Sequence, residues 1–247
     1  KNTGNTITQN LMNSPSPNNI RQGGILVGFE NGITVSSNTV DGISSTSDCF
    51  GIALGLTSIG TAVNAGNEVT NATVSRNIVG SVQNTGGFGS AGITVASATS
   101  GTNVIANNSI YGVGGTATPT DFNGGIILGG GAGSTTQVYF NSVSMTGTTT
   151  GSSPIFAIAV IASNPVLDIR NNAFFNTQTT TSGVRYAIGL GYPAPYTNLT
   201  INNNDYFTST LGSAGSFTTS ATTNIMSTRV AATTLTAFKT VTYVSIG

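Results

Sequence analysis

Short apolar segments recur along the chain at a nearly constant interval. One kind of segment has the form aliphatic-x-x-Asn-x-apolar, as in Ile105 to Ile110, which reads IANNSI. The spacings between successive asparagines are 28, 39, 31, 33, 31 and 32 residues, which indicates an internal repeat of about 31 residues. The seven repeated asparagines are Asn10, Asn38, Asn77, Asn108, Asn141, Asn172 and Asn204.

A second motif, with the form small-Ile-x-aliphatic-small, lies between these asparagines. Apolar positions alternate within four or five residues in both motifs, which predicts strands rather than helices. No segment of helical period separates the strands, so leucine-rich and βαβ repeats are disfavoured. The six isoleucines of this second motif are Ile25, Ile52, Ile93, Ile126, Ile158 and Ile188.

A repeat of this length, with short strands and turns rich in Gly, Asn and Ser, is typical of a parallel β-helix. Each coil stacks about 4.8 Å above the previous one, so equivalent residues form columns. Aliphatic columns would fill the core. The asparagine amides would hydrogen-bond along the stack, each donating to one neighbour and accepting from the other. A buried amide without partners costs about 1–3 kcal/mol, so we interpret the asparagine column as structural.

With these segments the chain resembles the right-handed parallel β-helix, or pectin-lyase-like, repeat proteins of bacterial cell surfaces and phage. Proteins of this group commonly carry an asparagine at a turn beside an aliphatic strand. The resemblance covers about residues 5–207 and implies an all-β, right-handed solenoid of about seven coils. This scaffold hosts lyases, hydrolases, adhesins and inert stalks, so the resemblance does not choose among activities.

The repeat is interrupted within the chain. Between Ile52 and Asn77 the spacing grows to 25 residues, which predicts a loop within residues 57–70 that projects from the stack. Segments rich in Thr, Ser and Gly occupy the same half of three later coils. We expect these segments to line one edge of the solenoid, either as an interaction surface or as solvated turns. They are residues 114–125, 146–154 and 177–183.

The two ends of the repeat differ. After Tyr206 the pattern stops, so we divide the chain into β-helix repeats over residues 1–207 and a C-terminal capping or assembly segment over 208–247. Within that segment we predict a short helix near residues 235–241 and a final strand over 241–247. Little precedes the first coil. An uncovered N-terminal face would then stack on a second copy, head to tail, or on more of the same parent chain.

The amino-acid composition limits the classes of molecule that this chain is expected to bind. Only 6% of residues are charged, the formal net charge is zero and there is no histidine. Such a chain has little attraction for nucleic acid or anionic lipid, and no apolar run is long enough to span a membrane. The single cysteine, Cys49, cannot form an internal disulfide. Because the chain opens directly into the repeat, we take it as a mature or excised piece.

Candidate catalytic groups are few. The resemblance implies a Lys or Arg base with a carboxylate-bound Ca²⁺ in the lyases, and aspartates with a supporting His in the hydrolases. The carboxylates of this chain lie at unrelated offsets from the repeated asparagines. Asp41 and Asp48 are close in sequence and could pair in a cleft, although Asp41 precedes a glycine in a turn signature. We therefore expect no catalytic residue and no cofactor.

Three other sites have two interpretations each. Asp168 and Arg170 share a strand face, as an exposed ion pair or as an acid–base couple. Asp121 with Asn123 could touch a calcium ion, but two oxygens do not make a site; we expect no metal. Cys49 has no histidine to activate it, so we expect a buried packing role.

Tyr192 and Tyr196 lie in GYPAPY, where the prolines suggest an exposed turn. This turn would be either a platform on which a glycan stacks or a packed loop.

Together these features favour a non-enzymatic extracellular structural protein of a bacterial surface, either a stalk segment or a self-assembling fibre subunit. The main alternative is a carbohydrate-binding or polysaccharide-cleaving module that acts through the loop edge. A host-cell adhesin is a third possibility, with surface glycans as partners.

Overall fold

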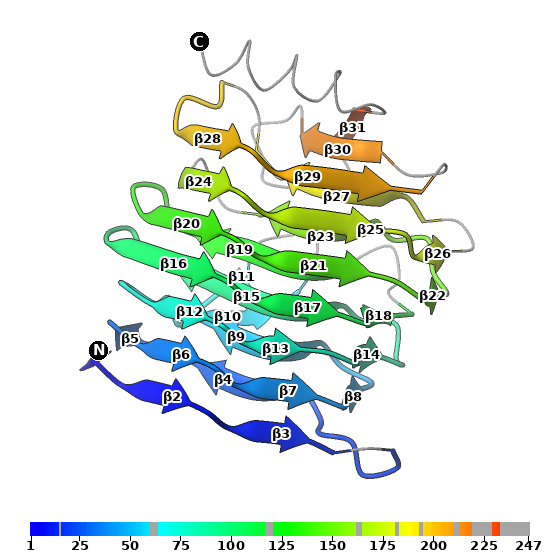
Figure 1. Ribbon diagram of the computed structural model, residues 1–247, viewed down its shortest axis with the longest axis horizontal. Helices are drawn as coiled ribbons and strands as arrows, with labels where there is room; N and C mark the ends of the chain where they lie inside the picture. The colour runs from blue at the N-terminus through cyan, green and yellow to red at the C-terminus, as the bar shows by residue number, and fades with distance from the viewer. Residues whose placement is uncertain are drawn as a thin grey trace.

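The computed structural model describes residues 1–14, 16–59, 64–116, 121–161, 165–180, 183–192, 195–209, 213–218 and 229–232. These residues form an all-β, right-handed parallel solenoid of about six turns and contain no helix (Figure 1). The predicted fold class is therefore confirmed. Seven strands stack in each of two sheets, so the chain passes through seven rungs.

Three long sheets form the walls of the solenoid. Sheet one has the order β2 (Thr6–Thr8), β6 (Thr34–Ser36), β12 (Thr73–Ser75), β16 (Thr102–Ala106), β20 (Thr135–Tyr139), β24 (Val166–Arg170) and β28 (Leu199–Asn202). Sheet two has the order β3 (Leu11–Asn13), β7 (Thr39–Asp41), β13 (Ile78–Val79), β17 (Ser109–Tyr111), β21 (Ser142–Met145), β25 (Ala173–Asn176) and β29 (Asp205–Thr208). Sheet three has the order β4 (Gly23–Val27), β9 (Cys49–Leu54), β15 (Ser90–Ser97), β19 (Asn123–Gly130), β23 (Ile155–Val160), β27 (Arg185–Leu190), β30 (Ser213–Thr218) and β31 (Arg229–Ala232).

Short strands fill the corners between these sheets. A three-stranded sheet joins β8 (Ile43–Ser45), β14 (Val82–Asn84) and β18 (Val113–Gly115). Three further pairs are β1 (Asn2–Thr3) with β5 (Glu30–Asn31), β10 (Leu56–Ser58) with β11 (Asn64–Ala65), and β22 (Thr148–Thr149) with β26 (Thr179–Thr180). In Figure 1 each rung crosses sheets one and two at the front and returns through sheet three behind.

The register of the strands confirms the predicted aliphatic columns. In sheet one, Val74 pairs with Val35 on one side and with Ile105 on the other. In sheet three, Ile93 pairs with Ile52 and with Ile126. These six side chains are all fully buried in one continuous core. A parallel stack with a constant period thus places like residues over like residues.

The small residue before each isoleucine of sheet three lets the opposite wall approach. A Cβ atom at Gly92 would lie 2.5 Å from Cγ2 of Ile110 and 2.6 Å from the carbonyl oxygen of Gly125. The same column contains alanine in later rungs, at Ala157 and Ala187, which belong to the core. The small-Ile pattern in the sequence is therefore a consequence of close packing between sheets two and three.

The predicted insertion between Ile52 and Asn77 contains an antiparallel pair of strands, β10 and β11. Leu56 and Ile59 in this insertion are buried in a second apolar cluster with Phe50 and Phe122. This cluster covers the outer face of sheet three. The described part of the insertion therefore lies against the solenoid, contrary to the prediction that it projects from the stack, and residues 60–63 lie outside the described residues.

The C-terminal end of sheet three extends past residue 207. Strand β30 continues the parallel stack on β27, and β31 then pairs with β30 in the antiparallel direction. The predicted helix over 235–241 and the predicted final strand over 241–247 lie outside the described residues. The division of the chain at 207/208 stays a prediction.

Candidate functional site

The asparagine column begins with an unusual backbone turn that every rung shares. The residue before each repeated asparagine has a φ between 53° and 58°, in the left-handed region. This turn directs the chain from sheet one into sheet two, and the five interior asparagines are at most 3% exposed. The residues in the left-handed conformation are Gln9, Ser37, Arg76, Asn107, Phe140, Asn171 and Asn203.

Each interior asparagine has all its polar groups satisfied by adjacent rungs. The backbone N–H and the Nδ2–H of Asn77 donate to Oδ1 of Asn108, at 3.0 and 2.9 Å. The second Nδ2–H of Asn77 donates to the carbonyl of Val35 in the preceding rung, at 3.0 Å. The carbonyl of Asn77 accepts the N–H of Ser109 at 2.9 Å. The predicted amide column is confirmed.

The same bonds repeat along all seven asparagines, and they all point one way. In each step the lower-numbered asparagine donates two hydrogen bonds and the next one accepts both, from Asn10 to Asn204. The column therefore has a polarity: its acceptor end is Asn10 and its donor end is Asn204.

The candidate catalytic pair does not form. Oδ1 of Asp41 accepts the N–H of Gly42 at 2.7 Å. Asp48 uses both carboxylate oxygens on backbone N–H groups, from Ile59 at 2.8 Å and from Gly89 at 3.0 Å. Burial raises the pKa of Asp48, and these two hydrogen bonds oppose part of that rise. Asp41 thus closes a turn, as its sequence suggested, and Asp48 holds the insertion onto the wall.

The other polar candidates have structural partners. Asp168 and Arg170 form an ion pair on the outer face of sheet one, which confirms the ion-pair interpretation. The hydroxyl of Tyr139 donates to Asp168 at 2.5 Å, and the Arg170 guanidinium lies 5.7 Å from the Tyr139 ring. Hydrogen bonding from Arg170 is the main cause that lowers the pKa of Asp168. Oδ1 of Asn123 accepts hydrogen bonds from Ser90. Among the described residues, no three His, Cys, Asp or Glu side chains group into a metal site.

Cys49 is fully buried, as expected for a packing role. Burial is the main cause that raises the pKa of its thiol to about 12, with a smaller contribution from Asp48.

Tyr192 and Tyr196 are not exposed, so the prediction of an exposed aromatic turn is wrong. Their exposed fractions are 2% and 0%, and both rings belong to the central core. The rings meet edge to face, with centroids 5.3 Å apart and an interplanar angle of 85°. Burial raises the pKa of Tyr196 to about 12. The turn places its rings in the core, so neither ring offers a face on which a glycan could stack.

A buried polar cluster near the C-terminal end is absent from the sequence predictions. Arg185 is 4% exposed and its Nη1 donates to the carbonyl of Gln178. Its Nε, Oε1 of Gln178 and Oδ1 of Asn176 have no hydrogen-bond partner in the structure. In sheet three Arg185 pairs with Ile155 of the preceding rung. Because the two residues differ in type, the sequence repeat gives no sign of a buried arginine at this position.

The loop edge is partly organised. Strands β22 and β26 pair in parallel, and the hydroxyls of Thr148 and Thr179 lie 2.8 Å apart. Two of the three predicted loops therefore do lie beside each other. In the first of them, residues 117–120 lie outside the described residues.

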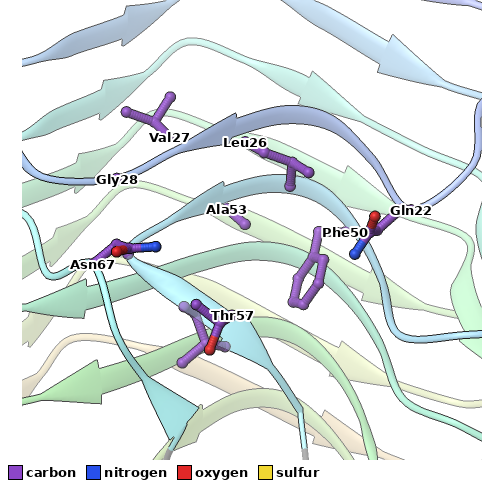
Figure 2. A pocket seen from close by; sticks show the side chains of 10 residues that line it. Gln22, Leu26, Val27, Gly28, Phe50, Ala53, Thr57 and Asn67 are labelled. Atoms are coloured by element: carbon purple, nitrogen blue, oxygen red, sulfur yellow. The ribbon is translucent and has the colours of Figure 1, made fainter.

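A cavity of about 360 Å³ opens at the N-terminal end of the outer face of sheet three. Figure 2 shows Gln22 and Asn67 at opposite ends of this cavity, with Ala53 and Phe50 between them. Leu26 and Thr57 also line it, and none of its lining residues is charged. The described lining residues can therefore offer apolar contact and amide hydrogen bonds.

The register of the sheets and the asparagine column define this chain as a parallel β-solenoid repeat protein. No family model matches the chain, and comparisons with curated proteins and with solved structures give no match either. No described segment forms a helix of the length and apolarity that crossing a membrane requires.

Proposed function

We propose that this protein is a non-enzymatic structural element of a bacterial surface, located outside the cell, as a stalk segment or a fibre subunit. One observation carries the proposal: a single column of amide hydrogen bonds runs through all seven rungs from Asn10 to Asn204. Such a column ties each rung to the next. It suits a protein whose task is to keep its shape along one axis.

The chemistry of the side chains supports the same proposal. Asp48, one of the two carboxylates of the candidate pair, accepts hydrogen bonds from backbone N–H groups with both oxygens. The thiol of Cys49 has a pKa raised to about 12, whereas a nucleophilic cysteine requires a lowered pKa. An extracellular location is consistent with a chain that gains its durability from continuous backbone pairing rather than from disulfides. It is also consistent with the resemblance to the pectin-lyase-like repeat proteins of bacterial surfaces.

Polysaccharide turnover and particle shape together test this proposal. The protein is incubated with a panel of acidic and neutral polysaccharides, while reducing ends and unsaturated products are measured. We expect no turnover, and we expect negative-stain micrographs to show short rods. Turnover that Asp41→Ala or Asp48→Ala abolishes would overturn the proposal. Asp205→Ala is the matched control, because Asp205 is exposed on β29.

A carbohydrate-binding module is the second candidate, and the cavity in Figure 2 favours it. Its apolar floor could contact the face of a sugar ring, while the amides of Gln22 and Asn67 bind hydroxyls. A glycan array followed by calorimetric titration tests this candidate. Binding that is lost in both Gln22→Ala and Asn67→Ala, and kept in Gln83→Ala on the short corner sheet, would support it.

A further inference from the structure

The first rung differs from the interior rungs in its hydrogen bonding. Oδ1 of each later asparagine accepts two hydrogen bonds, whereas Oδ1 of Asn10 accepts none from any residue that the structure describes. The second Nδ2–H of Asn10 donates to the carbonyl of Thr8 in its own rung, at 3.1 Å. In Asn38 the equivalent Nδ2–H donates to the preceding rung, at the carbonyl of Ile7. The acceptor end of the column is thus unpaired.

The same face leaves the apolar core open. Ile7 and Met12 are only partly buried although they pack on the core. A hollow of about 410 Å³ lies between these side chains and Ile25. Strands β2, β3 and β4 are each the last strand of their sheet at this end. Three sheet edges and the core therefore end together at one surface, which we name the N-terminal face.

The path of the chain indicates what fits this face. Strand β1 pairs in parallel with β5, with Asn2 opposite Glu30 and Thr3 opposite Asn31. Strand β5 precedes β6 as β1 precedes β2, so the chain already follows the solenoid path between Asn2 and Thr3. By this register, backbone ahead of Lys1 would run where sheet three of an additional rung belongs. Figure 1 shows the N-terminus at this end of the stack, beside β2 and β5.

We propose that the N-terminal face is the docking surface for one more parallel β-solenoid turn, which enters through Lys1 and carries its own asparagine. The asparagine of this turn would donate its N–H and Nδ2–H to Oδ1 of Asn10. The N–H of Leu11 would donate to its carbonyl, as the N–H of Thr39 does to the carbonyl of Asn10. Apolar side chains of the turn would fill the hollow. This inference rests on the proposed structural function and adds the direction in which the solenoid is extended.

The C-terminal end of a second copy does not fit the N-terminal face equally well. In sheet three, β31 runs antiparallel on β30 and occupies the position of the next rung. If β2 and β3 of one copy were stacked on β28 and β29 of another, β4 would meet β31. The occupant is therefore a turn of the interior type, without a reversed strand.

An extended chain tests the inference directly. A copy of residues 73–98 is placed ahead of Lys1, so that residues 1–5 replace the native connection that leads into the next rung. The control is the same extension with Asn77→Leu in the copy only. A second control has the copied residues in scrambled order. The readouts are the melting temperature and hydrogen exchange of the amides in β2, β3 and β4.

We expect the intact extension to raise the melting temperature by about 3–8 °C and to slow exchange at Leu11 at least about tenfold. The Asn77→Leu extension should give less than half of this gain, and the scrambled one none. An intact extension that behaves like the scrambled one would overturn the inference. So would a concentration-dependent oligomer of the unextended chain that Asn10→Leu abolishes, because a second copy would then be the occupant.

Failure of this inference and failure of the proposed function give different results. Polysaccharide turnover would remove the structural role, whatever the extended chain does. An intact extension without effect, in a protein with no turnover, would remove only the docking surface.

Discussion

Asn77 and Asn108 are joined by two hydrogen bonds to one atom: both the N–H and the Nδ2–H of Asn77 donate to Oδ1 of Asn108, at 3.0 and 2.9 Å. The two asparagines are 1% and 2% exposed. Because water cannot replace either partner at this depth, each amide in the column depends on the amides above and below it.

Removal of one amide in the middle of the column should therefore be severe. Asn108→Leu leaves the N–H and Nδ2–H of Asn77 without an acceptor, and Oδ1 of Asn141 keeps only the backbone N–H of residue 108 as a donor. We expect a loss of about 3–5 kcal/mol in the free energy of unfolding, measured by urea titration. Asn10→Leu is the matched control, since its Oδ1 serves no donor, and it should cost less than half as much. Equal losses at both positions would contradict the polarity of the column.

Because sheets two and three pack closely, we expect that adding a methyl group in the small-residue column destabilises the protein more than removing one does. Gly92→Ala would place a Cβ 2.5 Å from Cγ2 of Ile110 and 2.6 Å from a backbone carbonyl. We expect it to lower the free energy of unfolding by about 2–3 kcal/mol. In the same column Ala157→Gly only removes a methyl group and should cost less, about 1 kcal/mol. Thermal melts of the two variants check the difference, and a neutral Gly92→Ala would show that the walls can separate.

The left-handed residue before each asparagine gives a third prediction. Arg76 is exposed and has a φ of 56°, a conformation that asparagine tolerates and a β-branched residue does not. Arg76→Asn should preserve or slightly raise the stability. Arg76→Val should be less stable than Arg76→Asn by at least about 1 kcal/mol. Chemical denaturation of the pair measures this gap, and a valine variant as stable as the asparagine variant would argue against the turn.

The buried thiol of Cys49 predicts that the protein loses stability at alkaline pH. The pKa of Cys49 is raised by burial from 9.0 to about 12, so the unfolded thiol ionises at a lower pH than the folded thiol. The stabilising effect is complete below about pH 9 and is lost as the pH rises from about 9 to about 12. Cys49→Ala should flatten the pH dependence of the free energy of unfolding in this range. A native thiol that reacts with a colorimetric disulfide reagent as fast as the unfolded chain does would refute the burial.

Variants of Tyr192 test whether its ring stabilises the core by packing and whether its hydroxyl contributes. The hydroxyls of Tyr192 and Tyr196 are buried without a hydrogen-bond partner in the structure. Tyr192→Phe should therefore keep or slightly raise the stability, while Tyr192→Ala should lose about 3–5 kcal/mol through the cavity that it leaves. Calorimetric melting distinguishes these outcomes. A Tyr192→Phe variant that is strongly destabilised would mean that the hydroxyl is bonded.

The periodic part of the fold could be predicted because stacking turns a spacing in sequence into a column in space. Once Asn77 and Asn108 are seen to be one period apart, their contact follows from the 4.8 Å rise of a parallel stack, as do the pairs of Val74 and Ile93 with their neighbours. The structures of the candidate sites could not be predicted from the spacing of the repeat. The motif that contains Tyr192 and Tyr196 occurs once, so no repeat defines the register of its turn. The prolines beside these residues suggested exposure, although the rings are buried.

The period, the strands, the residues of the core columns and the need for amide pairing can all be deduced from the amino-acid sequence, because alternation and constant spacing are local properties of the chain. Three features are visible only in the folded chain: Asp48 holds the insertion against sheet three, Arg185 is buried beside Gln178, and the column presents an acceptor at Asn10. These depend on which way a side chain turns at a single position, and that is set by neighbours far apart in the chain.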